Sequence, residues 1–263
     1  MADLVYPPVI AVARVLFRLQ GLRFEIQGAQ NIPRTGGAVL AINHVGYFDF
    51  TYAGYAARES GRLVRFMAKS EVFNHPVAGF LMRGMHHISV DRSAGAASFR
   101  RAIEALRAGE IVGVFPEATI SMSFELKAFK NGAVRMAADA GVPLIPLVIW
   151  GYQRVWTKGL PKRLGRHHVP IRIAIGEPMR VTPTEDRDAA ARALRERMAA
   201  LLDGLQQGYP DRPAGERDGW WLPARLGGTA PTPEQARELE KAILAEQVAR
   251  RKAKAAKAAR RSP

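Results

Sequence analysis

The sequence predicts an α/β protein with a central mixed sheet of about seven strands, covered by helices on both faces. Short aliphatic runs alternate with helical patterns along the chain, and this alternation is typical of a sheet between helix layers. Glycine, proline or charged residues bound each aliphatic run, as they usually bound strands. With 263 residues, of which 48% are hydrophobic, the chain is long enough for one large domain with appendages.

The predicted elements follow one another in a regular order. The predicted strands are residues 23–27, 38–42, 64–68, 87–90, 111–115, 144–149 and 171–175. Amphipathic patterns predict helices at 94–107, 132–140 and 185–205. A first helix is expected from Pro8 and a last helix from Pro233.

Changes in composition divide the chain into four parts. Residues 1–22 contain an apolar helix in which Arg14 and Arg18 lie on one side and Val12 and Leu16 on the other. Such a helix either lies in a membrane interface or packs on the core, and the pattern leaves both open. The α/β domain is expected at 23–205. Residues 206–233 read as a Pro/Gly-rich linker or surface wrap, and 234–263 as a C-terminal helix with a basic tail.

Charge and cysteine content limit the classes of function. The formal net charge is +15, and the absence of cysteine excludes disulfides, thiolate catalysis and thiolate zinc sites. The last fourteen residues, RRKAKAAKAARRSP, carry seven basic and no acidic side chains. This tail favours an anionic partner, such as a membrane surface, a polyphosphate ligand or nucleic acid. No apolar run reaches the roughly 18 residues of a membrane-spanning helix. No known nucleic-acid motif appears, so no nucleic-acid partner is expected.

His44 and Asp49 follow the predicted strand 38–42 in the stretch AVLAINHVGYFD. Their side chains can meet only if the chain bends between them, and Gly46 allows such a bend. Ligands of α/β sheets usually bind at the carboxyl ends of strands. Asp49 would then accept a hydrogen bond from one imidazole nitrogen, and the other would be free to take a proton from a hydroxyl. Alternatively, Asp49 only caps a helix from Phe50, and His44 is a hydrogen-bonded turn residue.

Other polar residues stand at predicted strand ends or helix starts. They are Arg92 after strand 87–90, Glu117 and Thr119 after strand 111–115, and Lys130 before helix 132–140. A carboxylate and a hydroxyl at the end of a strand are placed for a ligand. Lys130 and the free N–H groups of the helix start would suit a phosphate. Taken singly, each of these residues also fits an ordinary surface or capping position.

Taken in order, the segments resemble the 1-acyl-glycerol-3-phosphate acyltransferase family of glycerolipid acyltransferases, over about residues 20–180. The family block N-H-x-[ST]-x-x-D corresponds to NHVGYFD at 43–49, and F-P-E-G-T-R-S corresponds to FPEATIS at 115–121. A block that ends in arginine after a strand corresponds to ISVDR at 88–92. The block F-K-x-G matches FKNG at 129–132, and V-P-I-[IV]-P matches VPLIP at 142–146.

The resemblance implies transfer of a fatty acyl group to the free hydroxyl of 1-acyl-sn-glycerol-3-phosphate, as part of phospholipid biosynthesis. The donor would be a thioester, acyl-CoA or acyl-carrier protein. His44 would be the general base and Asp49 would orient it. No cofactor and no metal ion is implied, since the thioester is already activated. Residues 23–205 would be the acyltransferase domain of a peripheral or monotopic enzyme, bound to an anionic membrane surface at the cytoplasmic face of the cell membrane.

The resemblance also assigns the substrate-binding residues. Arg92 and Lys130 would bind the acceptor phosphate, and Glu117 and Thr119 would shape the site or hold the glycerol. Where the family has an arginine, however, this chain has Ile120, which cannot make a charge-assisted hydrogen bond. The alternative acceptor is therefore a lysophospholipid with another head group.

Two milder departures and a rival of another class remain. Gly46 replaces the hydroxyl residue of the first block, and Ala118 replaces a glycine. The rival interpretation is a non-catalytic basic protein that binds membranes or nucleic acid. The intact pair of His44 and Asp49 argues against it, since a scaffold needs neither residue.

Overall fold

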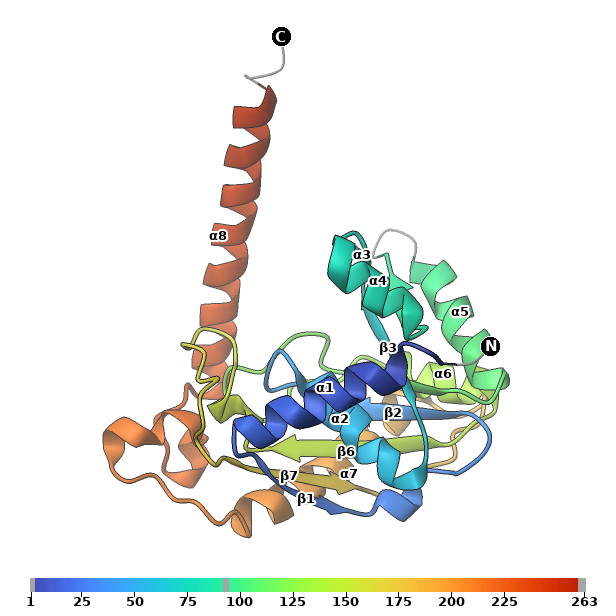
Figure 1. Ribbon diagram of the computed structural model, residues 1–263, viewed down its shortest axis with the longest axis horizontal. Helices are drawn as coiled ribbons and strands as arrows, with labels where there is room; N and C mark the ends of the chain where they lie inside the picture. Colours follow the sequence, from blue (N-terminus) through green and yellow to red (C-terminus); the bar gives the residue numbers. More distant parts are fainter. Residues whose placement is uncertain (1–2, 92–94, 260–263) are drawn as a thin grey trace. The chain divides into compact units, whose positions relative to one another are not determined.

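The computed structural model describes residues 3–91 and 95–259 and divides the chain into two compact units. The first unit contains the described residues up to Ile120 together with Ala128–Arg212. The second unit contains Ser121–Lys127 and the described residues from Pro213 onward. Figure 1 shows the elements of both.

The first unit is built on one seven-stranded sheet, which confirms the predicted fold class. The strands are β1 (Arg23–Gln27), β2 (Ala38–Ile42), β3 (Val64–Lys69), β4 (Ile88–Val90), β5 (Ile111–Val114), β6 (Leu144–Trp150) and β7 (Pro170–Ile175). Their order across the sheet is β1-β7-β6-β2-β5-β3-β4. Neighbouring strands run parallel except β6 and β7, which run antiparallel. The sheet is therefore mixed, with β2 near its centre.

Helices cover both faces of this sheet. The helices of the first unit are α1 (Tyr6–Leu19), α2 (Asp49–Ala57), α3 (Ser70–Phe73), α4 (Pro76–Gly84), α5 (Gly95–Arg107), α6 (Gly132–Ala140) and α7 (Arg187–Gln207). Short 3-10 turns occur at η1 (Ala29–Asn31), η2 (Arg58–Ser60) and η3 (Tyr152–Arg154). Figure 1 shows α1 and α2 in front of the sheet and α6 and α7 behind it. Helix α7 begins two residues later than predicted, because Asp186 caps it by accepting the N–H of Asp188 at 2.9 Å.

Strand β2 shows why the sheet needs both layers. All five of its residues are fully buried, as expected of a strand covered on both faces. Leu40 and Ile42 join the core cluster that includes Tyr52 and Ala53 of α2. Because side chains alternate along a strand, Val39 and Ala41 face the opposite helix layer.

Helix α1 packs on the first unit with one side and keeps apolar side chains exposed on another. Tyr6, Ile10 and Phe17 are buried, so one side packs on the first unit. On another side, apolar side chains remain exposed, with Val12 at 60%, Leu16 at 53% and Leu19 at 65%. Within the described ranges, no helix is long and apolar enough to cross a membrane.

Helices α3 and α4 were not predicted. Only Gly79 of α4 is buried, whereas Val77 and Phe80 are exposed. The helix begins with Pro76 after His75, whose imidazole accepts the N–H of Ala78 at 3.2 Å. Of its apolar residues, Leu81 packs against the cluster of Tyr6, Ile10 and Met85. With Val77 and Phe80 exposed, the apolar stripe that faces inward is weak, and periodicity does not reveal the helix.

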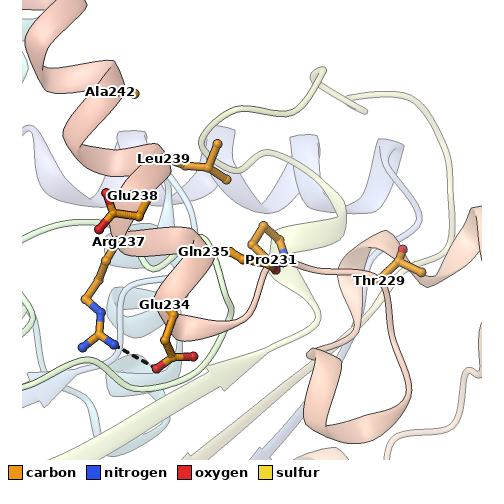
Figure 2. Close-up of a pocket in the computed structure, with 8 residues that line it drawn as sticks. All are labelled: Thr229, Pro231, Glu234, Gln235, Arg237, Glu238, Leu239 and Ala242. Carbon is orange, nitrogen blue, oxygen red and sulfur yellow. Dashed lines mark hydrogen bonds and ion pairs between the residues drawn. The ribbon is translucent and has the colours of Figure 1, made fainter.

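The second unit contains 3-10 turns η4 (Glu216–Trp221) and η5 (Ala224–Leu226) and the long helix α8 (Pro233–Ala259). Ion pairs hold it together internally, between Lys127 and Glu240 at 2.6 Å and between Arg225 and Glu125 at 3.3 Å. An open pocket is lined by residues between Thr229 and Ala242 (Figure 2). None of the predicted site residues lines it. The side chains of the basic tail beyond Arg250 lie outside the described residues.

Candidate active site

Two neighbouring parallel strands bring together the segments that carry His44 and Glu117. Strand β2 pairs with β5, and the carboxyl ends of parallel neighbours lie at the same edge of a sheet. After β2, the chain continues through Asn43 to His44, and after β5 it continues through Phe115 to Glu117. The backbone N–H of His44 donates to Glu117 Oε1 at 2.8 Å. The carboxylate of Glu117 is buried there, so it supports the main chain of the histidine.

The bend between His44 and Asp49 brings their side chains into contact. His44 Nδ1 lies 3.0 Å from Asp49 Oδ2. The same oxygen accepts the backbone N–H groups of Val45 at 2.7 Å and Gly46 at 2.9 Å. Asp49 therefore does not act as a helix cap: its carboxylate bonds residues that precede it, while Phe48 takes the N-cap position of α2.

Burial disfavours the charge of Asp49, and its hydrogen bonds favour it. The side chain is fully buried, and among the described residues its Oδ1 has no hydrogen-bond partner. Burial raises the pKa of Asp49, whereas the hydrogen bonds from His44, Gly46 and Val45 act in the opposite direction. With three donors converging on one oxygen, we assign the ionised carboxylate, which accepts the proton-bearing Nδ1 of His44.

The imidazole of His44 is held on its face as well as at its edge. The ring stacks on Phe115 with centroids 4.2 Å apart and planes 26° apart. The side chain remains 20% exposed. With Nδ1 engaged by Asp49, Nε2 is the nitrogen available to a hydroxyl group. The arrangement supplies an oriented base whose protonated form is stabilised by a buried carboxylate.

The turn from Asn43 to Asp49 is also fixed by β6, the other neighbour of β2. The buried Asn43 donates from Nδ2 to the carbonyl oxygen of Ile149 at 3.0 Å and accepts the Ile149 N–H on Oδ1 at 2.7 Å. Asn43 belongs to the motif found in the sequence, but this pair of bonds was not predicted. The pairing of β2 with β6 is the topological signal that would have pointed to the segment after β6.

The predicted substrate-binding residues are placed as follows. Lys130 and Thr119 are exposed, and the backbone N–H of Lys130 donates to the carbonyl oxygen of Pro116 at 3.0 Å. Lys130 therefore stands beside the segment that carries Glu117, just before α6. Arg92 lies outside the described residues.

Ala118 and Ile120, the two departures from the family motif in the segment FPEATIS, each have a clear structural setting. Ala118 has a φ of +61°, a left-handed conformation that favours glycine. Ile120 is only 7% exposed, so it is a packing residue. Over the described parts of the chain, no group of three or more His, Asp or Glu side chains is arranged to hold a metal ion.

Comparison with known proteins points to one family. Residues 23–150 match the model of the acyltransferase family. A 1-acyl-sn-glycerol-3-phosphate acyltransferase of Bacillus subtilis (strain 168) is 29% identical over 198 residues, which cover 74% of this chain and 89% of the relative. A protein of that name from Limnanthes alba is 32% identical over 145 residues, covering 54% of this chain and 50% of the relative. The chain thus matches nearly all of the bacterial relative but half of the plant one.

The fold is similar to a solved structure. The crystal structure of the 1-acyl-sn-glycerophosphate (LPA) acyltransferase PlsC from Thermotoga maritima superposes with a TM-score of 0.64 at 23% sequence identity. The match covers 76% of this chain and 78% of that protein.

Proposed function

Because the chain belongs to the acyltransferase family, we propose that it transfers a fatty acyl group from an acyl thioester to the free hydroxyl of 1-acyl-sn-glycerol-3-phosphate. The product would be phosphatidic acid, and the reaction would belong to phospholipid biosynthesis. The donor is acyl-CoA or acyl-carrier protein. The observation that carries the proposal is the 3.0 Å contact of His44 Nδ1 with Asp49 Oδ2 at the carboxyl end of β2.

The proposed reaction is a direct transfer. His44 Nε2 removes the proton of the acceptor hydroxyl while the hydroxyl oxygen attacks the carbonyl carbon of the thioester. The tetrahedral intermediate then collapses, the carbon–sulfur bond breaks, and the imidazolium returns the proton to the leaving thiolate. Asp49 stabilises the imidazolium between the two steps. General base catalysis of this kind contributes typically about 10²–10⁴-fold.

The acceptor is held by groups around the base. We assign its phosphate to Lys130 and Arg92, of which Lys130 is exposed next to the start of α6. A helix start with a lysine suits a phosphate, because its N–H groups and the cation act together. Glu117 shapes the site through its bond to the His44 backbone, and Thr119 lies exposed nearby in the sequence for contact with the glycerol.

A second acceptor class is favoured by one observation. Ile120 stands where the family motif has an arginine, and it is buried. A charge for the acceptor phosphate is therefore missing at this position. A lysophospholipid with a larger head group, whose phosphodiester carries less charge, is the alternative acceptor.

The exposed surface of α1 supports association with a membrane surface. Its exposed apolar side carries Val12, Leu16 and Leu19, and Arg14 and Arg18, on the other side of the helix, are also exposed. An amphipathic helix of this kind lies in a bilayer interface, with its arginines at the anionic head groups. We therefore propose a peripheral or monotopic enzyme at the cytoplasmic face of the cell membrane, to which the basic tail adds attraction.

The acceptor assay tests the reaction. Purified protein receives palmitoyl-CoA and lysophosphatidate, and then lysophospholipids with choline, ethanolamine or glycerol head groups. Formation of phosphatidic acid in preference to the other products supports the first assignment. Transfer only to a larger head group makes Ile120 a specificity residue. Absence of transfer from palmitoyl-CoA and palmitoyl-carrier protein to every acceptor contradicts the enzyme assignment.

Co-sedimentation with vesicles tests the surface. Leu16→Ser should weaken binding to vesicles of neutral phosphatidylcholine, because it removes an exposed apolar anchor. Leu164→Ser is the matched control, since Leu164 is 49% exposed in a loop of the same unit. Binding that requires anionic lipid or nucleic acid and disappears with salt, equally in both variants, would favour the basic scaffold instead.

A further inference from the structure

We propose that Tyr152 is a positioning residue for the catalytic turn, which we define as residues 43–49. It acts in two ways. Its hydroxyl holds the backbone at Phe48, and its ring occupies the space beside Gly46. This inference rests on the proposed function, since it concerns how His44 and Asp49 are held for the reaction.

The fit between Gly46 and Tyr152 is the first observation. A Cβ atom on Gly46 would lie 2.3 Å from Cε1 of the Tyr152 ring and 2.7 Å from the carbonyl oxygen of Trp156. Gly46 is not among the residues with a left-handed backbone, so its conformation does not require glycine. Glycine is required because the Tyr152 ring and the Trp156 carbonyl oxygen together leave no room for a side chain. This explains why the chain has no side chain where the family motif carries Ser or Thr.

The hydroxyl of Tyr152 is the second observation. It accepts the backbone N–H of Phe48 at 2.9 Å. Phe48 is the N-cap residue of α2 and directly precedes Asp49, so this bond fixes where the helix and its first carboxylate begin. Tyr152 is fully buried, and burial raises its pKa. The hydroxyl therefore stays protonated, and the ring is locked by neighbours such as Tyr52, 4.5 Å away between centroids.

The residues that follow Tyr152 extend the same contact. The carbonyl oxygen of Trp156 accepts the N–H of Tyr47 at 3.3 Å. Thr157 Oγ1, also buried, donates to the carbonyl oxygen of Val45 at 2.6 Å. Each of residues 45 to 48 is thus in contact with the segment 152–157. This segment follows β6, to which Asn43 is bonded, so a single element holds the turn along its length.

The positioning role predicts a specific catalytic defect. Tyr152→Phe keeps the ring and removes only the acceptor of the Phe48 N–H. We expect kcat to fall about tenfold, which corresponds to one hydrogen bond, with little change in the KM of donor and acceptor. Tyr52→Phe is the matched control, because Tyr52 packs in the same core cluster and, among the described residues, its hydroxyl makes no hydrogen bond to the turn. It should leave kcat near the wild-type value.

A coupled pair of substitutions tests the fit of ring and glycine. Gly46→Ser alone should reduce kcat strongly, because the new side chain meets the Tyr152 ring. Tyr152→Ala alone should also reduce it. In the combined variant the contact with the ring is gone and only the contact with the Trp156 carbonyl oxygen, at 2.7 Å, is left, so the loss should be smaller than the product of the two single losses, which is a coupling of neighbouring sites. Losses that simply multiply would contradict the proposed fit.

A spectroscopic readout separates this inference from the proposed function. The proton of His44 Nδ1 that bonds Asp49 gives a downfield NMR resonance, which His44→Gln identifies. Tyr152→Phe should move this resonance and Tyr52→Phe should not, whether or not the enzyme accepts lysophosphatidate. If Tyr152→Phe moves the resonance but the wild type has no activity, the proposed function is contradicted and the positioning role is supported. An unmoved resonance together with wild-type kcat in Tyr152→Phe would overturn the positioning role.

Discussion

Asn43 and Ile149 exchange two hydrogen bonds across the sheet, at 3.0 Å from Asn43 Nδ2 and at 2.7 Å to Asn43 Oδ1. The asparagine side chain thus continues the ladder between β2 and β6 by one more pair. Because Asn43 directly precedes His44, these two bonds fix the backbone of the base relative to the sheet.

Replacement of this amide by a carboxyl should destabilise the protein. In Asn43→Asp an oxygen faces the carbonyl oxygen of Ile149, and a buried acceptor is left unpaired. We expect the free energy of unfolding to fall by roughly 1–3 kcal/mol, as measured by urea denaturation at pH 7. Asn31→Asp is the control, because the side chain of the partly buried Asn31 donates to the carbonyl oxygen of Ile175 at 2.9 Å without the second bond that Asn43 accepts. Equal losses in the two variants would contradict the special role of Asn43.

Substitution of Asp49 should separate activity from stability. Burial raises the pKa of Asp49, so the folded state binds its proton more tightly than the unfolded state, and ionisation costs stability as pH rises through that interval. Asp49→Asn removes this cost, and its amide oxygen can still accept the N–H groups of Val45 and Gly46. We expect unchanged or higher thermal stability at pH 7 and a loss of kcat of at least about 10²-fold. A variant that is unstable but as active per folded molecule as the wild type would refute this assignment.

Relief of the strain at Ala118 should stabilise the protein. Its φ of +61° costs a non-glycine residue about 1–2 kcal/mol. Part of this gain is offset by the greater freedom of glycine in the unfolded chain. Ala118→Gly should therefore raise the free energy of unfolding by about 1 kcal/mol without loss of activity. Ala128→Gly, in a nearby exposed position without positive φ, should give no gain, and an equal gain there would argue against backbone strain.

His87 should make the fold sensitive to acid. The buried imidazole accepts the N–H of Phe66 on Nδ1 at 3.1 Å, and burial, with Arg65 and His86 nearby, lowers its pKa to about 4. The unfolded state therefore binds more protons between about pH 6.5 and pH 4, and stability falls as the pH is lowered through that range.

The variant His87→Asn isolates this effect. Its amide oxygen can still accept the Phe66 N–H but does not titrate in this range. We expect a shallower loss of unfolding free energy from pH 6.5 to pH 4 in the variant, by as much as about 3 kcal/mol over the range. Parallel pH curves for variant and wild type would show that other groups cause the acid sensitivity.

The strands were predictable because their signal is local. Aliphatic runs bounded by glycine, proline or charge predicted each of the seven strands, with ends within one residue of those observed. Helices α3 and α4 were not predictable, since Val77 and Phe80 are exposed and the inward apolar stripe is therefore weak. The start of α7 was shifted because two possible caps, Thr184 and Asp186, stand close together, and only the structure shows which one bonds.

The candidate site was predictable in its residue types and only partly in its connections. A bend at Gly46 was enough to suggest that His44 meets Asp49. The bond from His44 to Glu117 depends on β2 and β5 being neighbours, and the contacts of Asn43 and Tyr152 depend on β6. Such pairings join residues about 70 to 110 positions apart, and no local pattern encodes which strands are adjacent.

Comparison of wild type and His44→Ala in one acyl-transfer assay tests the central claim most directly. Palmitoyl-CoA and lysophosphatidate are the substrates, phosphatidic acid is the measured product, and circular dichroism verifies that the variant is folded. The account predicts transfer by the wild type and a rate lower by at least about 10²-fold in the folded variant. Equal rates of phosphatidic acid formation by the two proteins would contradict the role of His44 as the general base.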